Sequence, residues 1–247
     1  QFKDMDIDVI IASIPDHYET FKRLRDTYKP KAKLVIHIGN VLWHELPQFQ
    51  DGSIKNLLAS VAPFPVSHQT HTVFYHQETP PMPFKTPDYT SKTITSLVHL
   101  LPDSEQFMAL RSAMSDFQWR AYGAGAIDGI ADTLPTTIEI MENSLFGYHN
   151  KPGGDGFGHI IHSWGMTGRP VIINYHTYKN QLAGKFLIPD KTCIALVNRQ
   201  DTIDKIRYFS EPERHKQMCL AMRGAWEQAV NYEAEGQQLK EFFSTLV

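Results

Sequence analysis

Four glycines stand within nine residues at 151–159, in the run Lys-Pro-Gly-Gly-Asp-Gly-Phe-Gly-His. An apolar run at 144–148 precedes this glycine loop, a helix-like run at 157–167 follows it, and 168–170 leads into another apolar run at 171–173. The order strand, glycine loop, helix, strand is typical of a parallel α/β domain. Because glycine has no Cβ, a ligand can approach such a loop closely. The following helix presents amides and a partial positive charge, which favour phosphate.

Composition narrows the classes of partner. The chain has 247 residues, enough for one large domain or two modest ones. Its formal net charge of −3 argues against broad electrostatic capture of nucleic acid. No apolar run is long enough to span a bilayer, and no signal peptide opens the sequence. Cys193 and Cys219 form neither a metal-ligand spacing nor a disulfide framework, so a reduced, cytoplasmic setting is expected.

The first 80 residues predict a partial Rossmann-like domain. Its expected elements are a strand at 8–12, a helix at 15–28, a strand at 33–38 and short apolar elements at 57–60 and 72–76. Because Gln1 is not an initiator Met and a strand pattern begins at once, we expect material upstream to be missing. Prolines crowd the stretch at 81–92, which predicts a stiff linker to a second domain.

Residues 93–230 predict a second Rossmann-like domain that is doubly wound. Its expected strands lie at 93–101, 117–122, 145–148, 171–174 and 193–197, and its expected helices at 104–114, 133–143, 157–167 and 201–209. The pattern from 211 onward is helical, with a break near Asn231 or Gly236, so 231–247 is expected to form a C-terminal helix. The whole sequence therefore predicts an α/β protein of two Rossmann-like domains, with parallel sheets flanked by helices and the first domain short or truncated.

Two stretches carry a family resemblance: Lys-Pro-Gly-Gly-Asp-Gly-Phe-Gly at 151–158, and Ser-Trp-Gly-Met-Thr-Gly-Arg-Pro-Val-Ile at 163–172. They resemble the nucleotide-sugar-binding half of retaining GT-B glycosyltransferases, which carry Glu-Gly-Phe-Gly, a second Glu and then Gly-Pro-Val-Ile. Asp155 stands at the first Glu position and Ser163 at the second. In the family the first carboxylate lies by the donor sugar and the second holds the ribose hydroxyls. A serine can make one hydrogen bond there but no bidentate charged contact.

The resemblance covers 93–245 well, and 6–80 only as a generic half-domain. It implies two Rossmann-like domains across a cleft, with the donor bound mainly by the second and the acceptor by the first. The implied activity is transfer of a sugar from a nucleotide-diphosphate donor to a carbohydrate or other hydroxyl acceptor. The resemblance implies no cofactor and no obligatory metal, and it leaves room for a missing N-terminal segment or a partner chain.

Most candidate site residues surround the glycine loop. Asp155 is expected to orient the donor sugar, with a helix N-cap as an equal alternative. Lys151 and Arg120 are expected to supply positive charge to the diphosphate, although a surface lysine and a surface ion pair explain them as well. His99 can contact phosphate from a strand end, or it can be a core histidine. The remaining donor-binding candidates are Gly153, Gly154, Gly156, Phe157, Gly158 and Ser163.

Histidines provide the other candidates. His76 belongs to a histidine-rich stretch of the first domain and is the candidate general base for an acceptor hydroxyl. With twelve histidines in the chain, chance clustering is the alternative. His159 and His162 share one face of the glycine-loop helix. A third ligand is not apparent in the sequence, so packing or capping is expected there and no metal site is predicted.

Two other interpretations stay open. The chain can be a catalytically decayed, glycosyltransferase-like binding or partner subunit, which Ser163 and the short first domain favour. It can also be another Rossmann-type enzyme, such as a nucleotide-sugar epimerase. A hydride-transfer enzyme is disfavoured because Gly-x-Gly-x-x-Gly does not follow the first strand of either predicted domain. Turnover of nucleotide sugars distinguishes an active transferase from a binding subunit.

Overall fold

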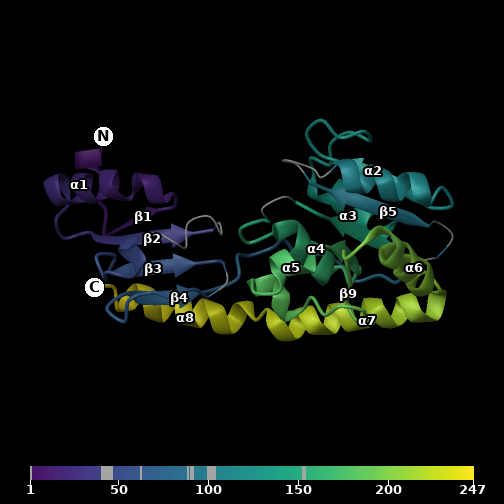
Figure 1. Ribbon diagram of the computed structural model, residues 1–247. Coiled ribbons are helices and arrows are strands. Elements are labelled where there is room, and N and C mark those ends of the chain that lie inside the picture. The colour runs from purple at the N-terminus through teal and green to yellow at the C-terminus, as the bar shows by residue number, and fades with distance from the viewer. Residues whose placement is uncertain are drawn as a thin grey trace. The chain divides into compact units, whose positions relative to one another are not determined.

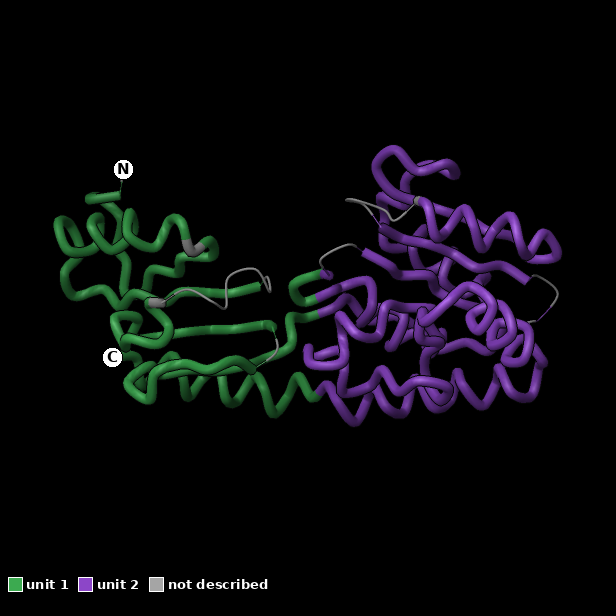
Figure 2. Tube along the Cα trace, viewed as in Figure 1, with its two compact units in different colours: residues 1–78, 155–157, 231–247 green, residues 79–154, 158–230 purple. Residues whose placement is uncertain are grey.

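A computed structural model describes residues 2–39, 47–61, 63–87, 89, 92–98, 104–151 and 154–247. The chain divides into two compact units, shown in different colours in Figure 2. Unit 1 comprises 1–78, 155–157 and 231–247, and unit 2 comprises 79–154 and 158–230. Three residues of the glycine loop thus belong to unit 1. Each unit contains one parallel sheet flanked by helices, which confirms the predicted α/β class.

Unit 1 has a four-stranded parallel sheet in the order β1-β2-β3-β4 (Figure 1). The strands are β1 (Val9–Ala12), β2 (Lys33–Ile38), β3 (Asn56–Ala59) and β4 (His71–Phe74). The helices are α1 (Tyr18–Tyr28) and α8 (Tyr232–Ser244), with short 3₁₀ turns η1 (Phe2–Asp4), η2 (Pro15–His17) and η4 (Pro47–Phe49). Apolar residues on both faces of the strands are buried, as expected for a parallel sheet covered on two sides. One of the two covers is α8, whose Phe242 packs against Val35 and Leu58.

Asn56 joins the end of the chain to the sheet of unit 1. Asn56 is 1% exposed, and its side-chain amide nitrogen donates to the carbonyl oxygens of Leu34 at 3.0 Å and Val247 at 2.9 Å. Its amide oxygen accepts from the Val247 N–H at 3.0 Å. The segment after α8 is therefore held by a buried polar side chain that sequence reasoning did not single out.

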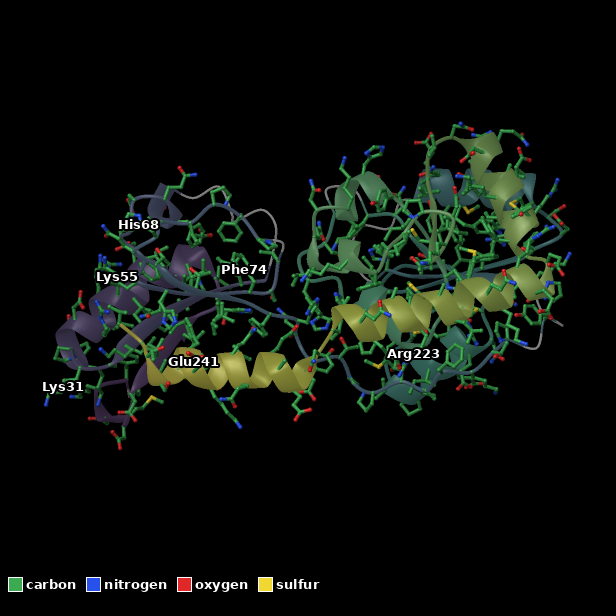
Figure 3. The ribbon with its side chains drawn as sticks, turned by 90° about the horizontal axis from the view of Figure 1, so that it is seen from below. Lys31, Lys55, His68, Phe74, Arg223 and Glu241 are labelled. Carbon is green, nitrogen blue, oxygen red and sulfur yellow. The ribbon has the colours of Figure 1, made fainter. Side chains whose placement is uncertain are left out.

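Asn56→Ala is expected to lower the free energy of unfolding of unit 1 by about 1–3 kcal/mol, because buried groups lose their partners. Urea unfolding followed by circular dichroism measures this change. Lys55→Ala is the matched control, because Lys55 is the exposed neighbour of Asn56 (Figure 3). Equal stability of the two variants would contradict the role of Asn56.

Unit 2 has a five-stranded parallel sheet in the order β6-β5-β7-β8-β9. The strands are β5 (Thr93–Leu97), β6 (Gln118–Tyr122), β7 (Phe146–His149), β8 (Val171–Ile173) and β9 (Cys193–Ala195). The helices are α2 (Ser104–Ala113), α3 (Leu134–Glu142), α4 (His159–Met166), α5 (Tyr175–Tyr178), α6 (Arg199–Phe209) and α7 (Pro212–Ala229), with a 3₁₀ turn η5 (Leu182–Lys185). The first strand, β5, lies between β6 and β7, so the strand order reverses beside it. This arrangement is the doubly wound topology that the sequence predicts.

Several boundaries differ from the sequence-based expectation. The glycine-loop helix begins at His159 rather than 157, because the chain is still left-handed at Gly158. The break in the C-terminal helical region falls at Val230–Asn231, the first of the two expected places, and Asn231 caps α8 by accepting from the Ala234 N–H at 3.0 Å. Gly236 lies inside α8. The short helices α5 and η5 were not expected.

The proline-rich stretch contributes to unit 2 rather than standing apart as a linker. Met82 is buried, and its N–H donates to the Sδ of Met166 at 2.9 Å. The ring of Phe84 occupies the space where a Cβ on Gly168 would lie, at 2.5 Å. Within the described part of the chain, none of the helices combines the length and the apolar character needed to cross a membrane.

Candidate functional site

The glycine loop follows the carboxyl end of β7, beside the point where the strand order of unit 2 reverses. Open α/β sheets bind ligands at this place, because the connections on either side of the reversal run to opposite faces of the sheet. Asn150, directly after β7, donates from its side-chain amide to the Gln106 Oε1 at 2.7 Å. This bond ties the start of the loop to α2, the helix that follows β5. Sequence reasoning missed both residues, although a polar pair, His149-Asn150, at a strand end was the available signal.

Two glycines of the loop have left-handed backbones. Gly154 has φ +77° and donates its N–H to the Lys151 carbonyl at 2.9 Å. A Cβ at Gly154 would lie 2.5 Å from the Cγ2 of Thr177 in α5. Gly158 also has φ +77°, and its carbonyl accepts from the N–H groups of Ile161 and His162 in the first turn of α4. Both positions therefore require glycine for conformational reasons, and Gly154 for steric reasons too.

The amides of the loop fall into two groups. Those of Gly154 and Phe157 are used within the protein, the second by the carbonyl of Gly39 at 3.1 Å. Among the described residues, no hydrogen-bond acceptor is found for the amides of Gly156 and Gly158. Gly158 is the N-cap of α4 and no side chain caps this helix, so Asp155 does not occupy the cap position. The amides of Gly154 and Phe157 are therefore not available to a ligand.

The other loop candidates differ in burial. Lys151 and Asp155 are half-buried, whereas Phe157 is only 4% exposed. His149 precedes the loop, and its Nε2 lies 3.0 Å from the hydroxyl of Tyr178, a fully buried residue of α5. The helix α5 thus lies against the loop region. Tyr178 contacts His149, and Thr177 lies next to Gly154.

The helix α4 is buried along most of its length. Gly147 in β7 lets the indole of Trp164 lie directly on the strand, because a Cβ there would be 2.6 Å from the ring. Ser163 is buried, and its hydroxyl donates to the His159 carbonyl at 3.0 Å. Its hydrogen is therefore used within the helix, and only acceptor capacity remains for a ligand. His162 packs its ring against Phe186 with centroids 5.0 Å apart, in keeping with the packing role expected for it.

Three of the expected donor contacts lie elsewhere or outside the described residues. Arg120 stands in the middle of β6, and its guanidinium donates to Asp128 at 2.8 Å. The same carboxylate accepts from the Ala121 N–H at 2.8 Å, so it closes the turn after β6. His99 and Gly153 lie outside the described residues.

A groove of about 590 Å³ lies on the face of β5 and β6 beside α3. Its lining includes Lys85, Thr95, Arg120, Tyr122, Glu139 and Asn143. The described residues of the glycine loop do not line it. Groups of three or more histidines, cysteines or acidic residues able to hold a metal ion are absent from the described residues.

In unit 1, polar side chains gather after the carboxyl ends of the strands. The Nδ1 of His76 lies 2.6 Å from the Oε1 of Glu235 in α8, and the His76 N–H donates to Oε2 at 2.8 Å. His37, in β2, has its Nε2 3.1 Å from the Tyr75 hydroxyl, and burial lowers the pKa of His37. Glu235 was missed in the sequence, because 159 residues separate it from His76.

Neither protein-family models nor curated protein sequences give a match to this chain. Several solved structures do match it. TarM from S. aureus is 13% identical with a TM-score of 0.72, over 96% of this chain and 55% of its own length. The pneumococcal O-GlcNAc transferase GtfA, solved with UDP and GlcNAc, is 11% identical with a TM-score of 0.67, over 98% and 58%. HepE from Anabaena, solved with UDP and glucose, is 12% identical with a TM-score of 0.73, over 97% and 78%.

The chain has the fold of GT-B glycosyltransferases, which confirms the expected resemblance at the level of fold. It spans little more than half the length of TarM and GtfA. At these identities the likeness concerns the fold alone.

Proposed function

We propose that this chain is part of a glycosyltransferase that binds a nucleoside diphosphate sugar at its glycine loop and transfers the sugar to an acceptor hydroxyl. The observation that carries the proposal is the pair of left-handed glycines, Gly154 and Gly158, beside the reversal of strand order in unit 2. That combination brings a backbone without side chains to the place where open α/β sheets bind ligands. Two neighbours of the same fold were solved with UDP, which makes a uridine nucleotide the first donor to test.

In the proposed reaction the diphosphate leaves with increased negative charge. The amides of Gly156 and Gly158 and the amino-terminal end of α4 stabilise this charge, and the Lys151 ammonium adds a full positive charge. Groups fixed before the reaction stabilise a developing charge without reorganising. Asp155 is proposed to orient the donor sugar. His76 is retained as the proposed base for the acceptor, and Ser163 contributes one acceptor bond to the ribose.

The nucleotide class can be tested by thermal denaturation with UDP, GDP and ADP. A ligand at 100 times its Kd stabilises the folded state by about 2.7 kcal/mol, so the correct nucleotide raises the melting temperature clearly. We expect UDP to give the largest shift. The absence of a shift with every nucleoside diphosphate would contradict the proposal.

Lys151→Ala is expected to weaken UDP binding about tenfold or more, because a charge-assisted contact to phosphate is lost. Arg120→Ala is expected to leave the UDP Kd within about twofold, because Arg120 already pairs with Asp128 and an exposed ion pair contributes little. Isothermal titration calorimetry measures both. A larger loss of UDP affinity in Arg120→Ala than in Lys151→Ala would indicate that the diphosphate binds away from the glycine loop.

A binding or partner subunit without turnover is the second candidate. Ser163 favours this second candidate. Its hydroxyl already donates within its own helix, and it stands where GT-B glycosyltransferases of the retaining type carry a carboxylate. UDP binding without hydrolysis or transfer of any UDP-sugar would support this alternative. Turnover of a UDP-sugar would contradict it.

A further inference from the structure

The Asp155–Phe157 segment of the glycine loop is anchored within unit 1. The N–H of Phe157 donates to the carbonyl of Gly39, at the end of β2, at 3.1 Å. Phe157 is 4% exposed, and its ring meets the ring of His76 edge to face, with centroids 6.1 Å apart and planes at 71°. The Phe157 backbone hydrogen bond and its buried aromatic contact with His76 both hold this part of the loop within unit 1.

His76 is in turn held by Glu235. One oxygen of the Glu235 carboxylate lies 2.6 Å from Nδ1 of His76, and the other accepts the His76 N–H at 2.8 Å. The two side chains are 2% and 15% exposed, so water competes little for these bonds. Two bonds from one carboxylate fix both the backbone and the ring of His76, and charge assistance makes such bonds short and strong.

Glu235 is itself well fixed. It stands in the first turn of α8, where a carboxylate interacts favourably with the amino-terminal end of the helix. The Asn231 side chain caps α8, and Phe242 packs the helix against the sheet of unit 1. The helix runs beside β4 (Figure 1). The position of Glu235 is therefore set by the packing of the whole helix.

We propose that Glu235 is a positioning residue for the glycine loop. Through His76 it holds Phe157, and through Phe157 it holds Asp155 and Gly156 in the geometry that the donor requires. We call the contacts of Glu235 with His76, and of His76 with Phe157, the anchor; all of them lie within unit 1. The effect of the anchor on donor binding rests on the proposed function. Pre-organising a binding loop raises affinity because less ordering is needed when the ligand binds.

Hydrogen exchange of the Phe157 amide tests the anchor without any ligand. In Glu235→Ala we expect this amide to exchange about tenfold faster, because local opening becomes easier when the bonds to His76 are lost. The amides of β2 and of α4 are expected to exchange at the wild-type rate. Glu241→Ala is the matched control, an exposed glutamate on the same helix (Figure 3). Unchanged exchange at Phe157 in a folded Glu235→Ala variant would overturn the proposal.

Glu235→Gln provides a second variant if the alanine variant fails to fold, because glutamine keeps the size and one acceptor. Its Phe157 amide is expected to exchange about two- to fivefold faster than in the wild type. A wild-type rate in Glu235→Gln, with Glu235→Ala unfolded, would also overturn the proposal.

UDP titration separates this inference from the proposed function. Faster exchange together with an about tenfold weaker UDP affinity supports both. Faster exchange with unchanged UDP affinity supports the anchor and contradicts the donor role of the loop. Weaker UDP affinity with unchanged exchange overturns the anchor and leaves the donor role in place.

Discussion

Replacing Gly154 by alanine is expected to abolish the rise in melting temperature that UDP gives the wild-type chain. The residue has φ +77°, a conformation that costs L-residues about 1–2 kcal/mol. The added Cβ would also lie 2.5 Å from the Cγ2 of Thr177, so the backbone at Gly154 must move. We expect UDP affinity to fall at least about 100-fold, or about 2.7 kcal/mol, because phosphate then meets a displaced backbone.

Two further variants isolate the cause of this loss. Gly125 also has φ +77° but has nothing within 4 Å of an added Cβ, so Gly125→Ala reproduces the backbone strain without the steric clash. It is expected to bind UDP as the wild type does. Thr177→Ser removes the clashing methyl group and is expected to restore part of the UDP affinity of Gly154→Ala. Full UDP binding by a folded Gly154→Ala variant would contradict the placement of the donor at this loop.

Lowering the pH from 7.5 to 5 is expected to destabilise unit 2 by about 2 kcal/mol through His215 alone. His215, in α7, is fully buried, and this burial lowers its pKa to about 4, although a hydrogen bond to the Leu145 carbonyl opposes the shift. In the unfolded chain the pKa is near 6.5. Between these values the unfolded state binds a proton that the folded state does not, so stability falls as the pH falls. Well above pH 6.5 both states are neutral and the effect vanishes.

Urea unfolding at pH 7.5 and pH 5, followed by tryptophan fluorescence, measures this effect. Trp119, Trp164 and Trp226 all report on unit 2. In His215→Gln the extra loss of stability at pH 5 is expected to disappear, because glutamine does not titrate. Gln in place of the exposed His176 is the control and is expected to keep the wild-type pH dependence. An identical pH dependence in wild type and His215→Gln would contradict the lowered pKa of His215.

The regular elements of both sheets follow from local sequence. Apolar runs such as those that form β2 and β7, and the glycines and prolines between them, predict strands and turns because burial and backbone sterics act over a few residues. The glycine loop was predictable for the same reason, since its conformation at Gly154 and Gly158 needs no information from elsewhere. The resemblance carried by these residues also predicted the GT-B fold.

Only the tertiary structure decided which side chains meet. Arg120 pairs with Asp128, and Glu235 reaches His76 across 159 residues of chain. The assignment of Asp155–Phe157 to unit 1, apart from the rest of their own loop, is of the same kind. Propensity and hydrophobic periodicity are short-range properties, and they place residues on elements. The partners of a polar side chain depend instead on how distant elements pack, and that packing cannot be predicted from a sequence pattern of a few residues.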